Sequence, residues 1–363
     1  MKSIYLSTVS LISSLGKNKE EHHQQILSNH SGIKIHEGKG FQGENLSMGW
    51  IENLNQNRAI SLLNLILNDL DSYIEKSILR KNHTRFIIST TKAEMSNFPN
   101  DTFDGLIQCV EKRYDAQNRV YVLSNACISG VLAINTAADY IQFGLCEHCV
   151  VIGIDLLWDF INYGFQSLFA VSSDICKPFD EKRNGISIGE AGACIVLSND
   201  FNIFNSFYGQ YLSGSCSNDA NHISGPSRTG EGLYRSIKKT IEKTTISAQE
   251  VQFISAHGTA TIFNDEMESI AFNRAELQNV PLNSLKAYFG HTFGAAGVLE
   301  TGICLLSMEK NILYRSLGFE KLGCTHSINV ISEHKQSEVN VVLKTSSGFG
   351  GGNATLLLKK SKV

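Results

Sequence analysis

A single cysteine lies at the corner between an apolar run and a helix-like run. Cys127 follows the segment VYVL in the stretch SNACISG, which leads into VLAINTAADYIQFG. A cysteine at the N-terminal end of a helix faces unpaired amides and the positive end of the helix dipole, which stabilise a thiolate and lower its pKa. Cys127 is therefore a candidate nucleophile. Free cysteines are also among the most often buried residues, so packing is the alternative for this turn taken alone.

Two histidines follow segments that read as strands. His257 lies in SAHGTAT, after the apolar run VQFI, and His291 lies in LKAYFGHTFGAAGVLE. Functional groups of α/β proteins are commonly placed at the carboxyl ends of buried strands. Thr259 and Thr261 follow His257 closely enough to hydrogen-bond a substrate amide. The alternative for His257 is a role in capping its loop.

Two further features could belong to the same site: a lysine near His291 and a glycine-rich turn late in the chain. Lys286 lies five residues before His291, so both side chains could face one pocket, although Lys286 could equally be a solvated surface charge. Phe349 lies between glycines in GFGGGN, which predicts a mobile turn that carries one aromatic ring. A phosphate-binding loop opens a helix, whereas this turn leads into a strand, which excludes a nucleotide site. One cysteine, two histidines, one lysine and a glycine-flanked phenylalanine, each on its own turn, together favour covalent thiol catalysis.

The elements that must position these residues alternate between strands and helices. Short β-branched or continuously apolar runs such as TRFIISTT, EHCVVIGIDL and AGACIVLSN predict buried strands. Runs with apolar residues at helical spacing, such as AISLLNLILNDLDSYIEKSIL, predict helices between them. This alternation predicts an α/β architecture. The chain has no low-complexity linker and no sequence repeat, so we expect one compact unit.

Composition narrows the class of protein. The 363 residues are 42% hydrophobic and 18% charged, with a net charge of -3, so the charge balance does not indicate a nucleic-acid partner. Nine cysteines, an odd number, suit free thiols in a reducing compartment. The pair Cys146 and Cys149 has C-x-x-C spacing without a second pair, so we expect packed thiols rather than a metal site. No run reaches membrane-spanning length, and we expect a soluble cytoplasmic protein.

Taken together and in this order, NACISG, KPFDEKRNGISIGEAGACIVL, HGTAT, SLKAYFGH and GFGGGN resemble the motifs of one enzyme family. They are similar to those of the β-ketoacyl-acyl-carrier-protein synthases, the elongating condensing enzymes of the thiolase-like superfamily. The second motif resembles the family's PFD…R.G…GEG stretch through Pro178, Phe179, Asp180, Arg183, Gly185, Gly189 and Glu190. The resemblance covers essentially the whole chain.

The resemblance implies a fold and an assembly. It implies a thiolase-like αβαβα five-layered sandwich of two pseudo-symmetric halves. Residues 1–203 would carry the nucleophilic cysteine, and residues 204–363 would carry the histidines, the lysine and the glycine-rich gate. The protein would pair as a homodimer, or as a heterodimer with another ketosynthase-like subunit.

The resemblance also implies roles for the residues that meet the substrate. Cys127 would take an acyl group as a thioester, with the oxyanion held by the backbone amides of Cys127 and Phe349. His257 and His291 would donate hydrogen bonds to the malonyl thioester carbonyl as CO₂ leaves. Phe349 would swing as a gate between acyl loading and malonyl binding.

Supporting roles are implied for a second set of residues. Lys286 and Glu300, with Asp265, would form a charge network that keeps the histidines oriented and neutral. Thr259 and Thr261 would line the tunnel for the pantetheine arm of acyl carrier protein. No cofactor and no metal is implied.

The sequence departs from the family pattern at several positions. Asn125 and Gly352 replace usual threonines, and Ser347 replaces an aromatic residue. The segment between Thr91 and Val120 is shorter than the cap usual in elongating synthases. These differences motivate a narrower hypothesis, an acyltransferase of a specialised polyene, aryl-polyene or polyketide pathway rather than of housekeeping fatty-acid synthesis.

Two other classes of function compete with this prediction. A chain-length-factor-like partner subunit would shape the product tunnel of an active synthase without catalysis, but such subunits lack the nucleophile found at Cys127. A degradative thiolase would use coenzyme A, but thiolases rely on a second catalytic cysteine. No other cysteine here lies in a comparable glycine-flanked turn.

Overall fold

Ten strands, five from each half of the chain, form the main sheet of the protein. The computed structural model describes residues 2–93, 95, 103–220 and 222–361. The strands of the first half are β1 (Ile4–Ser13), β4 (Thr84–Ser89), β5 (Tyr121–Leu123), β6 (His148–Asp155) and β8 (Ala191–Ser198). Those of the second half are β9 (Gly209–Asn218), β10 (Phe253–Ser255), β11 (Leu282–Asn283), β14 (Val341–Ser347) and β15 (Gly352–Lys360).

The two halves repeat the same strand order. The sheet runs β11-β10-β14-β15-β9-β1-β8-β6-β4-β5, so from the central pair outward each half has its first, last, fourth, second and third strand. The directions also match, with two antiparallel pairings followed by two parallel ones in each half. Strands β1 and β9 join the halves by pairing residues 4–6 with residues 209–211. The chain is therefore a structural repeat without a sequence repeat.

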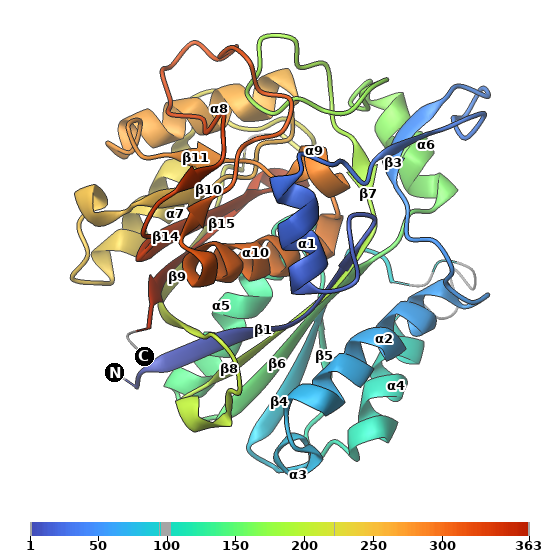
Figure 1. Cartoon of the computed structure of the whole chain (residues 1–363), viewed down its shortest axis with the longest axis vertical. Helices are drawn as coiled ribbons and strands as arrows, with labels where there is room; N and C mark the ends of the chain where they lie inside the picture. The colour runs from blue at the N-terminus through green and yellow to red at the C-terminus, as the bar shows by residue number, and fades with distance from the viewer. Residues whose placement is uncertain (1, 94, 96–102, 221, 362–363) are drawn as a thin grey trace.

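Helices form three further layers around these two half-sheets (Figure 1). Helices α5 (Ser129–Gln142) and α10 (Ala296–Lys310) pack between the half-sheets, where almost every side of α10 is buried. Helices α2 (Arg58–Tyr73) and α4 (Asp104–Tyr114) cover the outer face of the first half-sheet. Helices α7 (Glu231–Glu242) and α8 (Ile262–Arg274) cover that of the second. This arrangement confirms the predicted thiolase-like αβαβα fold, while the domain boundary after residue 203 stays a prediction.

Shorter elements connect these layers. The remaining helices are α1 (Lys19–Leu27), α3 (Lys76–Leu79), α6 (Asp159–Ser167) and α9 (Lys286–Phe289), and the remaining strands are β2 (Lys34–His36), β3 (Leu46–Gly49), β7 (Ile188–Gly189), β12 (Ile312–Leu313) and β13 (Lys335–Gln336). Lys286 was expected on a strand leading to His291, but it begins the one-turn helix α9. The predicted strand around SAHGTAT is also shorter, because the chain turns at Gly258, where φ is +42°.

The two central helices approach closely at a pair of glycines. A Cβ at Gly297 of α10 would lie 2.3 Å from the backbone nitrogen of Val131, and one at Gly130 of α5 would lie 2.7 Å from the nitrogen of Val298. Gly297 thus keeps the first turn of α10 narrow enough for tight packing on α5. It also sets the spacing between the helix that follows Cys127 and the helix that carries Glu300.

Replacing Gly297 by alanine is expected to destabilise the protein. The added methyl group cannot fit without separating α5 from α10, and overpacking of this kind costs roughly 1–3 kcal/mol. Thermal unfolding followed by circular dichroism measures the effect. Gly164→Ala is the matched control, because it lies exposed on α6 with nothing within 4 Å of its Cβ and should be neutral or slightly stabilising. Equal melting temperatures for the two variants would contradict this packing argument.

Candidate active site

Cys127 lies in a tight turn between β5 and α5, and 7% of it is exposed. Ala126 has a φ of 43°, which a non-glycine residue seldom adopts. Ser129 Oγ closes the turn by donating to the Ala126 carbonyl (2.6 Å) and accepting from the Asn125 backbone N–H (2.7 Å). The structure therefore places the sulfur at the N-terminal end of a helix, as the sequence predicted.

The turn that carries His257 is held by carboxylates of α8. Glu268 accepts hydrogen bonds from the backbone N–H groups of His257 (2.8 Å) and Gly258 (2.6 Å). A Cβ at Gly258 would lie 2.5 Å from the Cβ of Ser284. The glycine of HGTAT is thus required both by its positive φ and by this close approach.

His291 is positioned by backbone pairing with the β7 segment. Its N–H donates to the Ser187 carbonyl (2.7 Å), and its carbonyl accepts from the Gly189 N–H (3.0 Å). A Cβ at Gly189 would lie 2.0 Å from the Phe289 carbonyl oxygen, so the two segments can approach only because this residue is glycine. The GISIGE stretch of the sequence therefore supports His291.

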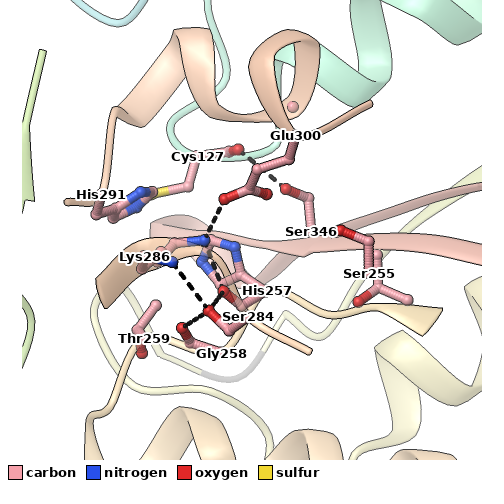
Figure 2. A network of polar contacts seen from close by, with 12 residues as sticks. Cys127, Ser255, His257, Gly258, Thr259, Ser284, Lys286, His291, Glu300 and Ser346 are labelled. Carbon is pink, nitrogen blue, oxygen red and sulfur yellow. Dashed lines mark hydrogen bonds and ion pairs between the residues drawn. The ribbon is translucent and has the colours of Figure 1, made fainter. Parts of the chain in front are cut away.

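Cys127, His257 and His291 converge on one point (Figure 2). His291 Nε2 lies 2.9 Å from Cys127 Sγ, and the two imidazole rings are edge to face with centroids 5.1 Å apart. The sulfur and one nitrogen of each ring all lie within 4.8 Å of one another. A single thioester carbonyl can therefore contact all three side chains.

Both imidazoles are held in the neutral state. Burial lowers the pKa of His257 and of His291 well below 6.5, and the ammonium groups of Lys286 and Lys344 lower both further. Neither Nδ1 has a hydrogen-bond partner among the described residues, so a doubly protonated, cationic ring would carry a buried N–H without an acceptor. We expect both rings to titrate below pH 6.5, measured by NMR of histidine-labelled protein. Titration of either ring above pH 7 would contradict the neutral assignment.

The thiol of Cys127 behaves differently from the sequence prediction. Burial raises its pKa to about 11, and the Lys286 ammonium and the Phe349 backbone N–H lower it only in part. The prediction that the helix terminus lowers this pKa is wrong for the free protein, because loss of solvation outweighs the favourable dipole. Cys127 is a thiol at neutral pH and needs a base when it attacks. His291 Nε2, neutral and 2.9 Å away, is placed to accept the proton.

Lys286 connects the histidine turn to the central helix α10. Its Nζ donates to the His257 carbonyl (2.6 Å) and to Glu300 Oε1 (2.8 Å), and both side chains are buried (Figure 2). Burial acts to raise the pKa of Glu300, but Lys286 and Lys344 lower it below its usual value. Lys286 is therefore part of the site and not the solvated surface charge that the sequence left open.

Asp265 takes a different place from the one expected. It accepts from the backbone N–H groups of Thr259 (3.0 Å) and Phe179 (2.7 Å), and its nearest cation is Arg183 at 4.0 Å. Burial raises its pKa to about 7. Asp265 thus shapes the loop beyond His257, whereas Glu268, which sequence reasoning missed, contacts the histidine turn itself. Its position one helical turn after Asp265 was the available signal.

A cavity of about 370 Å³ opens above the cysteine and the two histidines. Thr259 and Thr261 line it, with their hydroxyl oxygens 2.8 Å apart. Phe349 lies at its wall, 37% exposed, and stacks on Phe165 with ring centroids 5.2 Å apart. Nothing lies within 4 Å of a Cβ built on Gly350. The structure therefore brings the predicted pantetheine residues and the predicted gate to one cavity.

The three departures from the family pattern fall in different surroundings. Ser347 lines the cavity and donates to Asn353 Oδ1 (2.8 Å). Gly352 packs on Ile128, while Asn125 is exposed and is not among the described residues that line the cavity. Of the shortened cap, residues 94 and 96–102 lie outside the described residues, and α4 forms most of the remainder.

A buried ion pair braces the loop that follows His291. Lys92 Nζ lies 2.7 Å from Asp155 Oδ1, and Asp155 Oδ2 accepts from the Gly294 N–H (2.7 Å). The Lys92 ammonium also lies 4.5 Å from the centre of the Phe293 ring. Sequence analysis did not single out this pair, because Asp155 ends a strand that reads as uniformly buried and Lys92 lies in the segment after β4 without a motif of its own.

The cysteine and the two histidines form the only cluster with metal-ligand spacing in the described parts of the chain. The ammonium groups of Lys286, Lys344 and Lys92 act on these histidines and disfavour a cation between them. Cys146 and Cys149 are buried free thiols, as are most of the nine cysteines. No helix among the described residues is long and apolar enough to cross a membrane.

Comparison with known proteins agrees with the fold. Residues 93–200 match the family described as "Beta-ketoacyl synthase, N-terminal domain", and residues 208–320 match "Beta-ketoacyl synthase, C-terminal domain". The fold and these matches define a thiolase-like α/β protein of the ketosynthase class. The chain belongs to the β-ketoacyl synthase family.

A curated relative also supports membership of this family. 3-Oxoacyl-[acyl-carrier-protein] synthase 2 of Rhizobium meliloti is 29% identical over 270 residues, which are 69% of this chain and 63% of that protein. The match to this relative thus spans less than two thirds of its length.

Solved structures match over nearly the full chain. A chain from the complex of a ketosynthase with its chain length factor, from Xenorhabdus doucetiae, is 25% identical with a TM-score of 0.87, covering 99% of this chain and 98% of that one. A β-ketoacyl synthase of Burkholderia phymatum, 20% identical and fully covered in both directions with a TM-score of 0.84, shares the fold.

Proposed function

We propose that the protein is a β-ketoacyl synthase that elongates an acyl chain by decarboxylative condensation with a malonyl group on acyl carrier protein. The observation that supports this most is the convergence of Cys127, His257 and His291, from three turns far apart in the sequence, on one cavity. A thiol with an adjacent neutral imidazole suits acyl transfer, and two imidazole donors suit an enolate.

The first step is acyl transfer to Cys127. The sulfur attacks the thioester carbonyl of the acyl group, its proton passes to His291 Nε2, and the new C–S bond forms as the carrier thiolate leaves. That thiolate takes one proton from the imidazolium, and His291 returns to the neutral state with its remaining proton on Nε2, the tautomer that can donate in the condensation step. The backbone amides of Cys127 and Phe349 hold the oxyanion, and Lys286 keeps the His257 turn in place.

The second step is condensation. His257 and His291 donate to the malonyl thioester oxygen, the bond to the carboxylate breaks, and CO₂ leaves an enolate. The enolate carbon attacks the acyl thioester on Cys127, the C–C bond forms, and the C–S bond breaks. The released thiolate takes a proton from solvent, which restores the thiol. Phe349 is the gate between the two steps, and Thr259 and Thr261 contact the pantetheine arm.

The partners follow from the same reaction. Acyl-loaded and malonyl-loaded carrier proteins are its substrates, and the chain pairs with a second copy or with a related subunit. Strand β5 ends the sheet, and Tyr121 on it is 41% exposed, which offers an edge for such pairing. The full-length likeness to a chain of a ketosynthase and chain length factor complex supports a specialised polyene, aryl-polyene or polyketide pathway.

Acyl transfer in isolation separates this function from that of a non-catalytic partner subunit. The purified protein is incubated with acyl carrier proteins that bear a panel of acyl groups, and intact mass is measured. The enzyme is expected to gain the mass of one acyl group per chain. A protein that gains no acyl mass from any carrier, alone or with added synthase, would instead be a partner subunit.

A further inference from the structure

Lys344 is a second ammonium group buried beside the candidate active site. It lies on β14 and has no exposed surface. Its Nζ lies 2.6 Å from Glu300 Oε2, while Lys286 Nζ lies 2.8 Å from Oε1 of the same carboxylate. Glu300 is therefore shared between two ammonium groups that come from different elements of the fold.

The two lysines hold the segment before His257 at two points. Lys344 Nζ donates to the carbonyls of Thr345 (2.6 Å) and of Ser255 (3.3 Å), the last residue of β10. Lys286 Nζ donates to the carbonyl of His257 itself (2.6 Å). Loss of the Lys344 ammonium would leave two buried backbone oxygens without this donor and one oxygen of Glu300 without its counter-charge.

The buried charges balance only when Lys344 is included. Glu268 and Glu300 are both buried near His257, and Lys286 alone compensates one of them. Thr345, the residue after Lys344, connects this charge network to Glu268, because its Oγ1 donates to Glu268 Oε1 (3.2 Å). An uncompensated buried carboxylate is costly, so Lys344 supplies the second positive charge.

The other charged groups around the two imidazoles are already paired. Lys92 pairs with Asp155, and Arg183 lies against Asp265. The remaining titratable neighbours are Cys127, which is a thiol at neutral pH, and the imidazoles themselves. These groups stay in place when Lys344 is changed.

We propose that Lys344 is a positioning residue of the condensation step, which acts through Glu300 to hold Lys286 and the His257 turn and whose charge opposes protonation of both imidazoles. The inference rests on the proposed function, which it deepens. Lys344 is among the groups that lower the pKa of His257 and of His291, after burial and Lys286. It is not among the main groups that act on the pKa of Cys127.

Lys344→Met tests the proposal, because it keeps an unbranched side chain and removes the charge. The acid limb of the pH–rate profile of malonyl decarboxylation is expected to move to higher pH. On the plateau above that limb, kcat is expected to fall about tenfold, because the segment before His257 loses one of its two anchors. Acylation of Cys127 is expected to stay within about threefold of wild type, since His291, the base of that step, is held by the backbone of Ser187 and Gly189, which Lys344 does not contact. Leu343→Met, at the next buried position of β14, is the packing control and should keep the wild-type pH profile.

A double-mutant cycle with Glu300→Gln shows whether Lys344 acts through Glu300. The loss caused by Lys344→Met should be much smaller in the Glu300→Gln background than in wild type, because the shared partner is already neutral. Additive losses, or an unchanged acid limb in a folded Lys344→Met variant, would overturn the proposal.

Histidine NMR separates this inference from the proposed function, because it needs no turnover. His257 and His291 should titrate at higher pH in Lys344→Met than in wild type, and unchanged titration would overturn the inference even in an active enzyme. Absence of acyl transfer and decarboxylation in the wild-type protein would instead refute the proposed function.

Discussion

Cys127→Ala is expected to abolish the acyl-enzyme and to reduce condensation by at least ~10³-fold. Among the described residues, the sulfur is the only thiol or carboxylate that clusters with the two imidazoles. Alanine removes it without disturbing the turn, because the turn is closed by Ser129 and by backbone groups. Intact mass after incubation with acyl carrier protein measures the adduct, and release of labelled CO₂ in the presence of both substrates measures turnover.

A second cysteine variant, Cys216→Ala, is the control for non-specific acylation. Cys216 is exposed on β9 and is more accessible to a thioester than the buried Cys127. Cys216→Ala should keep the adduct and full activity. An acyl adduct that persists in Cys127→Ala and disappears in Cys216→Ala would reverse the assignment of the nucleophile.

His257→Ala and His291→Ala are each expected to lower malonyl decarboxylation by roughly 10²–10³-fold. Each change removes one of the two N–H donors that face the enolate oxygen in a buried site, where such donors are worth most. The measurement is release of CO₂ from labelled malonyl carrier protein by protein that already bears an acyl group. Normal decarboxylation by either variant would remove that histidine from the mechanism.

The two histidine variants should differ in the acyl-transfer step. Only His291 hydrogen-bonds the sulfur, so His291→Ala should also slow acylation of Cys127, because the thiol with its raised pKa loses its base. In His257→Ala, Cys127 should accept the acyl group at close to the wild-type rate. This result would also show that the variant is folded. Equal loading rates for both variants would contradict the role of His291 as the base.

The turns that carry chemistry could be predicted from the sequence, because each has a local signature. Small residues around Cys127 and the glycine of HGTAT reflect backbone conformations that are visible in residue type alone. The α/β fold followed from the alternation of strand and helix patterns and from the resemblance. Convergence of the three turns could not be derived from spacing, since it depends on how α5, β10 and β7 pack.

The charge network was harder to predict. Lys344 lies in the strand pattern VVLKTSS, where a lysine is usually taken as facing solvent, and its burial depends on α10 lying across β14. The pKa of Cys127 could not be predicted either, because the helix dipole and burial act in opposite directions. The balance of these two effects depends on how far the Cys127 thiol is exposed to solvent, which only the folded structure defines.

A single-turnover chase tests the central claim most directly. The protein is first loaded with an acyl group, freed of carrier, and then mixed with malonyl-acyl-carrier protein while its intact mass and released CO₂ are followed. We predict that the acyl mass leaves Cys127, that one CO₂ appears per acyl group lost, and that the carrier gains a 3-oxoacyl chain two carbons longer. Loss of the acyl group as free acid, without CO₂ and without a longer chain on the carrier, would contradict the account.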